Sequence, residues 1–310
     1  MKKVFIDGSA GTTGLRIKER LLAREDIQLL TLPEELRKNN EARRKMLNEA
    51  DVVFLCLPDA AAVEAVAMIE NDRTVVIDTS TAHRTAPGWT YGFPELVGAA
   101  TVATSKRIAN PGCHASGFVA LVAPLVRAGL ISPDVKLSAF SLTGYSGGGK
   151  KMIAEYEGEE RAPLLGAPRQ YGLSQTHKHL PEMAAVCGLQ NLPHFSPIVA
   201  DYYAGMEVTV PLFAADLKGS KEDVVRVYKE TYGRGLVRYK EVPDEGGFLS
   251  ASFMAGRDDM EIYVCGNEER ITLVARFDNL GKGASGAAIQ NMNILLGVNE
   301  QEGLVIGEET

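Results

Sequence analysis

The sequence predicts an α/β protein with two domains, a parallel-sheet domain first and an α+β domain after it. Three observations support this fold class. The chain has 310 residues, of which 45% are hydrophobic and 24% charged, so it can bury the cores of two domains. Short apolar runs alternate with helical periodicity near the N-terminus. After residue 112 the apolar runs become longer and partly alternating.

The N-terminal domain is predicted from its strand-helix-strand order. A strand over 2–8 precedes a helix over 13–25, and further strands are expected within 27–32, 51–57 and 74–80. Val, Ile and Leu fill these runs, as they do in parallel strands that are covered on both faces. The alternation therefore predicts a Rossmann-type parallel sheet with helices on both sides.

A glycine-rich turn joins the first predicted strand to the first predicted helix. It has a GxxGxxG spacing and consists of Gly8, Ser9, Ala10, Gly11, Thr12, Thr13 and Gly14. Glycines allow a tight turn, and the helix start then presents backbone N–H groups that suit a pyrophosphate. The position between a strand and a helix favours a dinucleotide site over a turn that only packs a helix on a strand.

The second domain is predicted to be of the α+β class, with a mixed or antiparallel sheet. Its strands are expected within 135–147, 206–213, 260–266 and 271–280, and its helices over 118–130 and 221–233. A last helix over 283–297 has an apolar stripe that is expected to pack back on the first domain. The predicted domains are therefore 1–112 with 285–310, which binds the cofactor, and 113–284, which carries catalysis and oligomerisation.

Cys113 follows a Pro-Gly turn in the stretch ANPGCHASGF and precedes an apolar helical run. The positive end of a helix dipole favours a thiolate, which is the nucleophilic form of cysteine. Backbone N–H groups of the same turn could hold a developing oxyanion. Cys56, Cys187 and Cys265 lie in or beside apolar runs and are expected to be buried and inert.

A cysteine nucleophile needs an acid or base nearby, and two of the five histidines stand close together in THKHLPEM. In an extended segment His177 and His179 would project to one face, just before a helix that Pro181 can start. We expect His179 to be the acid/base group, with Glu182 able to orient its ring, and His177 to position the substrate. His114 is expected to be structural, and the sequence leaves His194 undecided.

Two segments are suited to binding anions. DTSTAHR ends a predicted strand with polar residues and Arg84, at the edge of the sheet where ligands bind. TGYSGGGK is expected to be a flexible glycine loop with a hydroxyl and Lys150. Both cations suit a phosphate or a carboxylate. SGGGK lacks the spacing of a P-loop, which disfavours a nucleoside triphosphate.

These motifs, in this order, resemble the N-acetyl-γ-glutamyl-phosphate reductase family in its shorter form, within the semialdehyde dehydrogenase superfamily. The resemblance rests on DGSAGTTG, DTSTAHR, NPGCHASG, SLTGYSGGGK, HKHLPEM and GKGASGAAIQNMN, which extend from residue 7 to residue 293. His83 and His114 depart from the commoner family patterns, roughly DLSADFR and NPGCYPT.

The resemblance implies a reductase of arginine biosynthesis that uses a cysteine thioester. In such an enzyme Cys113 attacks the acyl phosphate, hydride from NADPH reduces the thioester, and a histidine handles the proton. The resemblance also implies that Arg84, Asn110, Ser146, Lys150 and Glu182 bind the substrate. Pro58, Ser80, Lys282 and Gly283 would contact the cofactor. Family members are usually dimers or tetramers, so a homodimer or homotetramer is expected.

The cofactor can also be argued from the residues themselves. NAD sites usually place an acidic residue at the end of the second strand, about 20 residues beyond the glycines. Here the second apolar run contains Thr31, and Glu34 and Glu35 follow a proline that is expected to turn them away. Thr12, Thr13, Arg16, Arg37 or Lys38 could instead bind a 2′-phosphate, so NADP is the expected cofactor.

Composition argues against several classes of partner and location. The formal net charge of −7 and the scattered basic residues argue against a nucleic-acid surface. No apolar run approaches the roughly 18 residues of a membrane span, and the apolar start is too short for a signal peptide, so a cytoplasmic location is expected. The four cysteines lack metal-ligand spacing, and no metal is expected. Two alternatives remain, a dehydrogenase for another acyl phosphate such as aspartyl phosphate, and a nicotinamide-sensing protein without turnover.

Overall fold

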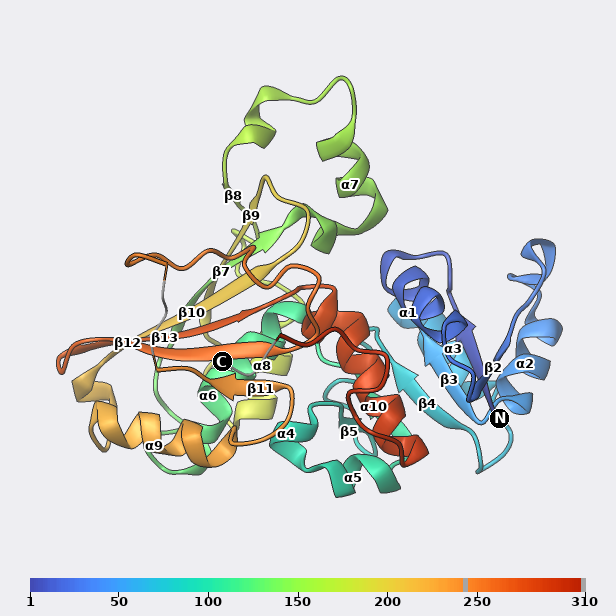
Figure 1. Ribbon diagram of the computed structural model, residues 1–310, viewed down its shortest axis with the longest axis horizontal. Helices are drawn as coiled ribbons and strands as arrows, with labels where there is room; N and C mark the ends of the chain where they lie inside the picture. Colours follow the sequence, from blue (N-terminus) through green and yellow to red (C-terminus); the bar gives the residue numbers. More distant parts are fainter. Residues whose placement is uncertain (242–244, 308–310) are drawn as a thin grey trace. The chain divides into compact units, whose positions relative to one another are not determined.

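The computed structural model describes residues 1–241 and 245–307, and it divides into two compact units (Figure 1). The first unit comprises Met1–Pro111 and Ala284–Leu304, and the second comprises Gly112–Gly283 and the segment from Val305 on. The segment from Val305 on was expected in the first unit. It belongs to the second because Val305 and Asp258 exchange two hydrogen bonds, of 2.7 and 2.9 Å.

The first unit contains a six-stranded, all-parallel sheet in the order β2-β1-β3-β4-β6-β5, which confirms the predicted Rossmann-type architecture. The strands are β1 (Lys2–Asp7), β2 (Ile27–Leu30), β3 (Val52–Leu55), β4 (Val75–Asp78), β5 (Thr90–Tyr91) and β6 (Arg107–Ala109). The helices are α1 (Thr12–Leu22), α2 (Asn40–Glu49), α3 (Asp59–Ala67), α4 (Pro94–Val97), α5 (Ala99–Thr104) and α10 (Gly286–Leu296).

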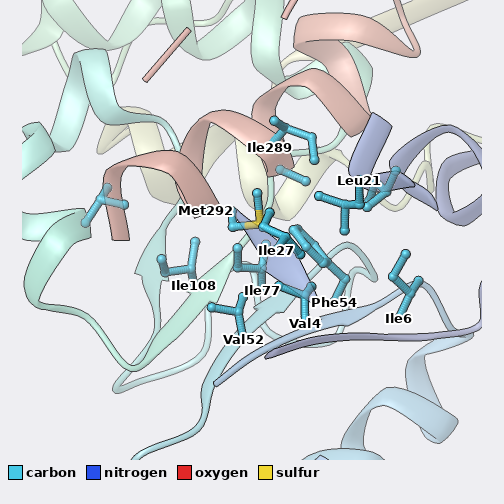
Figure 2. Close-up of a cluster of buried hydrophobic side chains, with 13 residues drawn as sticks. Val4, Ile6, Leu21, Ile27, Val52, Phe54, Ile77, Ile108, Ile289 and Met292 are labelled. Carbon is cyan, nitrogen blue, oxygen red and sulfur yellow. The ribbon is translucent and has the colours of Figure 1, made fainter. Parts of the chain in front are cut away.

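Alternate side chains of these strands enter two different cores. Val4, Val52 and Phe54 lie in a core with residues of α1 and α10, and Figure 2 shows Ile289 and Met292 in the same cluster. Phe5, Val53 and Leu55 point the other way, into a core with residues of α2 and α3. Because both faces are covered, the strands are almost continuously apolar. The last helix therefore packs on the first unit, as its apolar stripe predicts.

The strand order of this sheet changes direction at β1. From β1 it crosses to β2 on one side, and then to β3 on the other side. Crevices at such switch points, at the carboxyl ends of the strands, are where open α/β sheets bind ligands. The glycine-rich turn follows β1 at this point.

The second unit contains a seven-stranded mixed sheet in the order β11-β12-β13-β10-β7-β9-β8. Its strands are β7 (Ser138–Gly144), β8 (Arg169–Gln170), β9 (His194–Ala200), β10 (Met206–Phe213), β11 (Val237–Tyr239), β12 (Met260–Gly266) and β13 (Arg270–Phe277). Its helices are α6 (Cys113–Arg127), α7 (Gly149–Glu157), α8 (Leu180–Cys187) and α9 (Lys221–Thr231). The predicted α+β class is therefore confirmed.

Helix α6 packs against β10 and β13 at one face of this sheet. Gly117 makes the close approach possible, because a Cβ atom there would lie 2.6 Å from Cγ2 of Val208. On β10 the residues of this face, such as Val208 and Val210, are buried, and those of the opposite face, such as Phe213, are more exposed. Figure 1 also shows that α7 lies in an arm that extends away from the sheet.

The helix start expected at Cys113 is confirmed, and the apolar run expected as a helix over 118–130 is the later part of α6, which ends at Arg127. The expected flexible glycine loop is instead a 3-10 turn (Tyr145–Gly148) followed by α7. β9 was not predicted. The expected helix over 283–297 is a π-helical turn (Gly281–Ser285) that continues into α10.

Ile289→Ala tests whether α10 is part of the core of the first unit. Ile289 is 1% exposed, so the truncation should leave a cavity and lower the free energy of unfolding by about 2–5 kcal/mol. Trp89, the only tryptophan, lies in this unit, so its fluorescence can follow unfolding in urea. Leu22→Ala, at a side chain 66% exposed, should change the value by less than about 0.5 kcal/mol. Equal effects of the two substitutions would contradict this packing.

Candidate functional site

The glycine-rich turn after β1 is tightly constrained. Gly8 has a φ of 88°, and a Cβ atom there would lie 2.3 Å from the carbonyl oxygen of Cys56, which follows β3. A Cβ atom on Gly14 would lie 2.6 Å from the carbonyl oxygen of Gly8. Only glycine fits both positions without displacing backbone. The turn therefore brings the start of α1 close to the ends of β1 and β3.

The start of α1 is suited to an anion. Gly11 is the N-cap residue, and no side chain caps the helix, which begins at Thr12 and Thr13. The N–H groups of a first helical turn have no partner within the helix, and the dipole is positive there. These groups therefore fit the pyrophosphate of a dinucleotide.

A cavity of roughly 750 Å³ adjoins this turn within the first unit. Its walls come from the end of β1, the turn itself, the end of β2 and the segment that leads into α2. They include Gly8, Ser9, Ala10, Thr31, Glu34, Glu35, Arg37 and Lys38. A cavity of this size and position suits the adenosine half of a dinucleotide.

The expectation that Pro33 turns Glu34 and Glu35 away is wrong. β2 ends at Leu30, and the 3-10 turn Glu34–Leu36 keeps both carboxylates at the cavity. Glu34 forms an ion pair with Arg37, which offsets part of its charge.

The other residues predicted to contact cofactor or substrate in the first unit follow neighbouring parallel strands. Pro58 follows β3 and is the N-cap residue of α3. Ser80 follows β4, and Asn110 follows β6 and donates through Nδ2 to the carbonyl oxygen of Ala284 (3.0 Å). Arg84 donates to the carbonyl oxygens of Asn110 and Thr79, each at 3.1 Å. Because parallel strands end at one edge, these residues share an edge with the glycine turn.

Buried Asp78 organises the segment DTSTAHR. Its carboxylate accepts hydrogen bonds from the backbone N–H (2.9 Å) and the hydroxyl (2.7 Å) of Ser80, and it lies 2.6 Å from Nδ1 of His83. The His83 ring also stacks on Trp89 at 4.0 Å. His83 thus holds the strand end in place.

Cys113 is the first residue of α6, with Gly112 as its N-cap residue. Buried Glu182 accepts a hydrogen bond from the backbone N–H of Gly112 (2.8 Å). The first hydrogen bond of the helix itself runs from Ser116 to Gly112 (2.8 Å), so the preceding N–H groups are directed out of the helix start. Gly283 packs directly on the cysteine, because a Cβ atom on it would lie 3.1 Å from Cβ of Cys113.

His177 and His179 lie together, but in a turn rather than in the expected extended segment. The backbone N–H of Leu180 donates to the carbonyl oxygen of His177 (3.0 Å), and His179 is the N-cap residue of α8. The two rings meet edge to face at 4.7 Å. The backbone N–H of His179 donates to Nδ1 of His177 (3.2 Å), so a neutral His177 carries its proton on Nε2.

His114 adjoins the histidine pair from α6, with its ring 5.5 Å from that of His177 and 5.6 Å from that of His179. Burial, together with the nearby His177 and Lys178, lowers the pKa of His114 to about 3. His114 therefore stays neutral at working pH and cannot act as the acid. His194, the first residue of β9, is exposed.

The remaining predicted residues of the second unit differ in exposure. Ser146 is 1% exposed and accepts a hydrogen bond from Nδ2 of Asn279 (3.0 Å). Lys282 is buried in the π-helical turn, next to Gly283. Lys150 is exposed in the first turn of α7.

The other three thiols are less suited to nucleophilic chemistry. Burial raises the pKa of Cys56 to about 12, and it also raises the pKa of Cys187 and of Cys265. A high pKa leaves little thiolate at neutral pH. Cys187 is buried as expected, whereas Cys56 and Cys265 are only half-buried.

Tyr171, Ser141 and Asn279 are polar neighbours of the predicted site that sequence reasoning missed. Tyr171 bonds to His114, Ser141 bonds to the other nitrogen of the same ring, and Asn279 holds Ser146. A single tyrosine in a loop, or a serine within a strand, has no spacing that reveals such a role.

In residues 1–241 and 245–307, no three His, Cys, Asp or Glu side chains gather as a metal site would require. In the same residues, no helix has the length and apolar character needed to cross a bilayer.

Two family models match the chain. The model for the semialdehyde dehydrogenase NAD binding domain matches residues 30–104, in the first unit. The model for the semialdehyde dehydrogenase dimerisation domain matches residues 113–279, in the second.

Solved structures support the same fold at low sequence identity. Aspartate semialdehyde dehydrogenase II from Vibrio cholerae, complexed with ASA, aligns with a TM-score of 0.71 and 16% identity over 96% of this chain and 98% of that one. Aspartate semialdehyde dehydrogenase from Candida albicans, with NADP, aligns with a TM-score of 0.62 and 16% identity over the same shares.

Curated relatives are much more similar in sequence. An N-acetyl-gamma-glutamyl-phosphate reductase from Brucella ovis is 44% identical over 306 residues, which cover 95% of this chain and 99% of the relative. One from Rhizobium meliloti is 43% identical over 305 residues, covering 95% and 98%. Similarity of this extent, together with both domain matches, means that the chain belongs to the N-acetyl-γ-glutamyl-phosphate reductase family of semialdehyde dehydrogenase-type enzymes.

Proposed function

We propose that this chain reduces N-acetyl-γ-glutamyl phosphate to N-acetylglutamate 5-semialdehyde, with NADPH as reductant and release of phosphate, in arginine biosynthesis. The observation that carries the proposal is the position of Cys113 at the start of α6, with Gly283 packed on it. A thiol there is activated by the helix end, and it both attacks and leaves readily.

The thiolate of Cys113 attacks the acyl carbon, the bond from that carbon to the phosphate oxygen breaks, and phosphate leaves. A thioester on Cys113 results. Backbone N–H groups at the start of α6 stabilise the negative charge that develops on the acyl oxygen. On this proposal Arg84, Ser146 and Lys150 bind the anionic ends of the substrate, and Asn110 and Glu182 also contribute to substrate binding.

When bound, NADPH supplies the hydride that converts the thioester carbon to the oxidation level of an aldehyde. His179 donates a proton to the tetrahedral oxygen and takes it back as the carbon–oxygen double bond forms and the carbon–sulfur bond breaks, so that the aldehyde leaves and the Cys113 thiolate is restored. His177 positions the substrate.

The residues of the first unit fit a dinucleotide. Gly8 and Gly14 let backbone approach closely, the start of α1 is uncapped by side chains, and the cavity beside them has a suitable size. On this proposal Gly8 to Gly14 hold the pyrophosphate, and Pro58, Ser80, Lys282 and Gly283 contact the rest of the cofactor.

We propose NADP rather than NAD on three grounds. Thr31 directly follows β2, Glu34 is compensated by Arg37, and Lys38 lines the same cavity. A 2′-phosphate would thus meet the cation of Lys38, while Arg37 offsets the charge of Glu34 and Glu35 remains as a negative charge at the same cavity.

The proposal includes a homodimer or homotetramer in the cytoplasm. The dimerisation-domain match supports an oligomer. So does the sheet face opposite α6, where Phe140 is 45% exposed and Phe213 is 64% exposed.

Cys113→Ser should lower turnover by more than about a hundredfold while NADPH still binds, because a serine hydroxyl is scarcely ionised at neutral pH. The assay is the phosphate-dependent oxidation of N-acetylglutamate semialdehyde, followed by absorbance of the reduced nicotinamide, with aspartate semialdehyde as comparison substrate. Cys265→Ser, at a half-buried thiol, should leave turnover near the wild-type level. A serine variant that kept more than a few per cent of activity would rule out covalent catalysis by Cys113.

His179→Asn should lower kcat more than it raises KM, because loss of the acid affects the chemical step. His177→Asn should raise KM more than it lowers kcat, because His177 positions the substrate. Steady-state kinetics on both variants measure this split. The opposite pattern would exchange the two roles.

The cofactor assignment predicts a higher kcat/KM for NADPH than for NADH. Lys38→Ala should lower kcat/KM for NADPH about tenfold, as expected for one lost charge-assisted contact, and leave NADH nearly unaffected. Lys45→Ala removes a lysine from α2 that does not line the cavity, and should change neither value. A wild-type preference for NADH would mean that Glu34 or Glu35 binds the ribose.

A further inference from the structure

Three segments of the second unit meet at one end of its sheet. The pairing of β10 with β7 and with β13 places the end of β7, the start of β10 and the end of β13 side by side. Ser146 follows β7, Gly205 precedes β10, and Asn279 follows β13. The register of the sheet therefore gathers three residues that are distant in the chain.

Asn279 joins the other two segments through its side-chain amide. Its Oδ1 accepts a hydrogen bond from the backbone N–H of Gly205 (2.9 Å), and its Nδ2 donates to the hydroxyl oxygen of Ser146 (3.0 Å). Asn279 and Ser146 are each 1% exposed. Because a backbone N–H only donates, the amide oxygen must face Gly205, and the amide nitrogen must then face Ser146.

This direction leaves the proton of Ser146 available. The amide nitrogen of Asn279 has only hydrogens to offer, so the Ser146 oxygen is the acceptor. Within residues 1–241 and 245–307 the hydroxyl of Ser146 makes this one hydrogen bond. A buried hydroxyl whose proton meets no acceptor costs free energy. Ser146 is therefore prepared to donate to an acceptor outside the described chain.

Backbone hydrogen bonds hold Ser146 and Asn279 in position. The N–H of Ser146 donates to the carbonyl oxygen of Tyr203 (3.0 Å), which ties the 3-10 turn of Ser146 to the loop before β10. Next to Asn279, the buried carboxylate of Asp278 accepts a hydrogen bond from the N–H of Leu280 (2.6 Å). The orientation of the hydroxyl is thus set before any ligand binds.

The segment from Asp278 to Gly283 also contacts the proposed nucleophile. The N–H of Gly283 donates to the carbonyl oxygen of Asp278 (3.0 Å), and a Cβ atom on Gly283 would lie 3.1 Å from Cβ of Cys113. The same short segment therefore contacts both Ser146 and Cys113.

We propose that Asn279 is a positioning residue, which fixes the hydroxyl of Ser146 as a hydrogen-bond donor to an anionic oxygen of the reactants, in a phosphate or a carboxylate. The inference deepens the proposed function, because it rests on Ser146 lying at the substrate site. An anionic oxygen only accepts hydrogen bonds, and hydrogen bonds to it are stronger than those between neutral groups. It is therefore the group that this donor fits best.

The experiment is the phosphate-dependent oxidation of N-acetylglutamate semialdehyde, with KM measured separately for phosphate and for the aldehyde. Ser146→Ala should raise one of these KM values about tenfold and change kcat by less than about twofold, because a charge-assisted hydrogen bond to a bound group is lost. A rise in KM for phosphate would place the hydroxyl at the phosphate. A rise in KM for the aldehyde would place it at the carboxylate.

Asn279→Asp tests the positioning step, because it replaces the amide with a carboxyl group of the same shape. One carboxylate oxygen still accepts from Gly205, but the other faces Ser146 and takes its proton. The KM that rises in Ser146→Ala should rise about tenfold here too, at high pH. The rise should diminish as pH falls, because a protonated carboxyl donates to Ser146 as the amide does.

Two further variants separate positioning from repulsion between the new carboxylate and the anion. If Asn279 acts through Ser146, adding Asn279→Asp to Ser146→Ala should change KM by less than about twofold, whereas repulsion would raise KM equally in both backgrounds and would overturn the inference. Asn279→Ala introduces no charge and frees the hydroxyl to rotate. It should raise the same KM by about threefold.

Asn191→Asp is the matched control. Asn191 follows α8 in the same unit, and its Nδ2 donates to the carbonyl oxygen of Asp134 (2.8 Å) in an exposed hydrogen bond. The control introduces the same charge and loses one hydrogen bond. It should leave kcat and both KM values near the wild-type level.

The outcomes distinguish this inference from the proposed function. Unchanged KM values for both reactants in Ser146→Ala would overturn the donor role of Ser146. A raised KM in Ser146→Ala, with wild-type KM values in both single variants of Asn279 at every pH tested, would overturn the positioning by Asn279. A wild-type enzyme that does not oxidise the aldehyde when phosphate and the nicotinamide cofactor are present would contradict the proposed function itself.

Discussion

The second unit depends on how the start of α6 is held. Buried Glu182 accepts the N–H of Gly112, and a carboxylate in that position is costly unless it is hydrogen-bonded, so α8 and α6 fix each other. Gly283 closes on the cysteine from the π-helical turn, where a larger residue would meet Cβ of Cys113. The residue before α8 is His179, so the contact that fixes the helix start also fixes the histidine pair.

The first unit also contains a helix start that no side chain caps, at α1. α1 also begins after a glycine with no side-chain cap, but it adjoins a cavity lined with polar and charged groups rather than a histidine pair. A helix start that lacks a side-chain acceptor can serve a phosphate or a developing oxyanion equally well. In this chain both helix starts therefore offer backbone N–H groups without a side-chain cap, at α1 and at α6.

Patterns of a few neighbouring residues were sufficient to predict the sheet type of the first unit and the start of α6. Strand-helix alternation predicted the parallel sheet, and the Pro-Gly turn predicted a helix start at the cysteine. β9 escaped prediction because Pro197 interrupts its apolar run, although the sheet tolerates it. The carboxylates of Glu34 and Glu35 were misplaced because strand ends are poorly defined by sequence. The links from Ser141 through His114 to Tyr171 join residues distant in the chain, and only the fold brings them together.

The central claim is that Cys113 carries the substrate as a thioester, and it can be tested without hydride transfer. The enzyme is mixed with N-acetyl-γ-glutamyl phosphate in the absence of any nicotinamide, quenched in acid, digested and analysed by mass spectrometry. We expect phosphate release in proportion to enzyme, with one N-acetylglutamyl group on the peptide that contains Cys113. Unmodified Cys113 in an enzyme that reduces the substrate when NADPH is added would contradict the account.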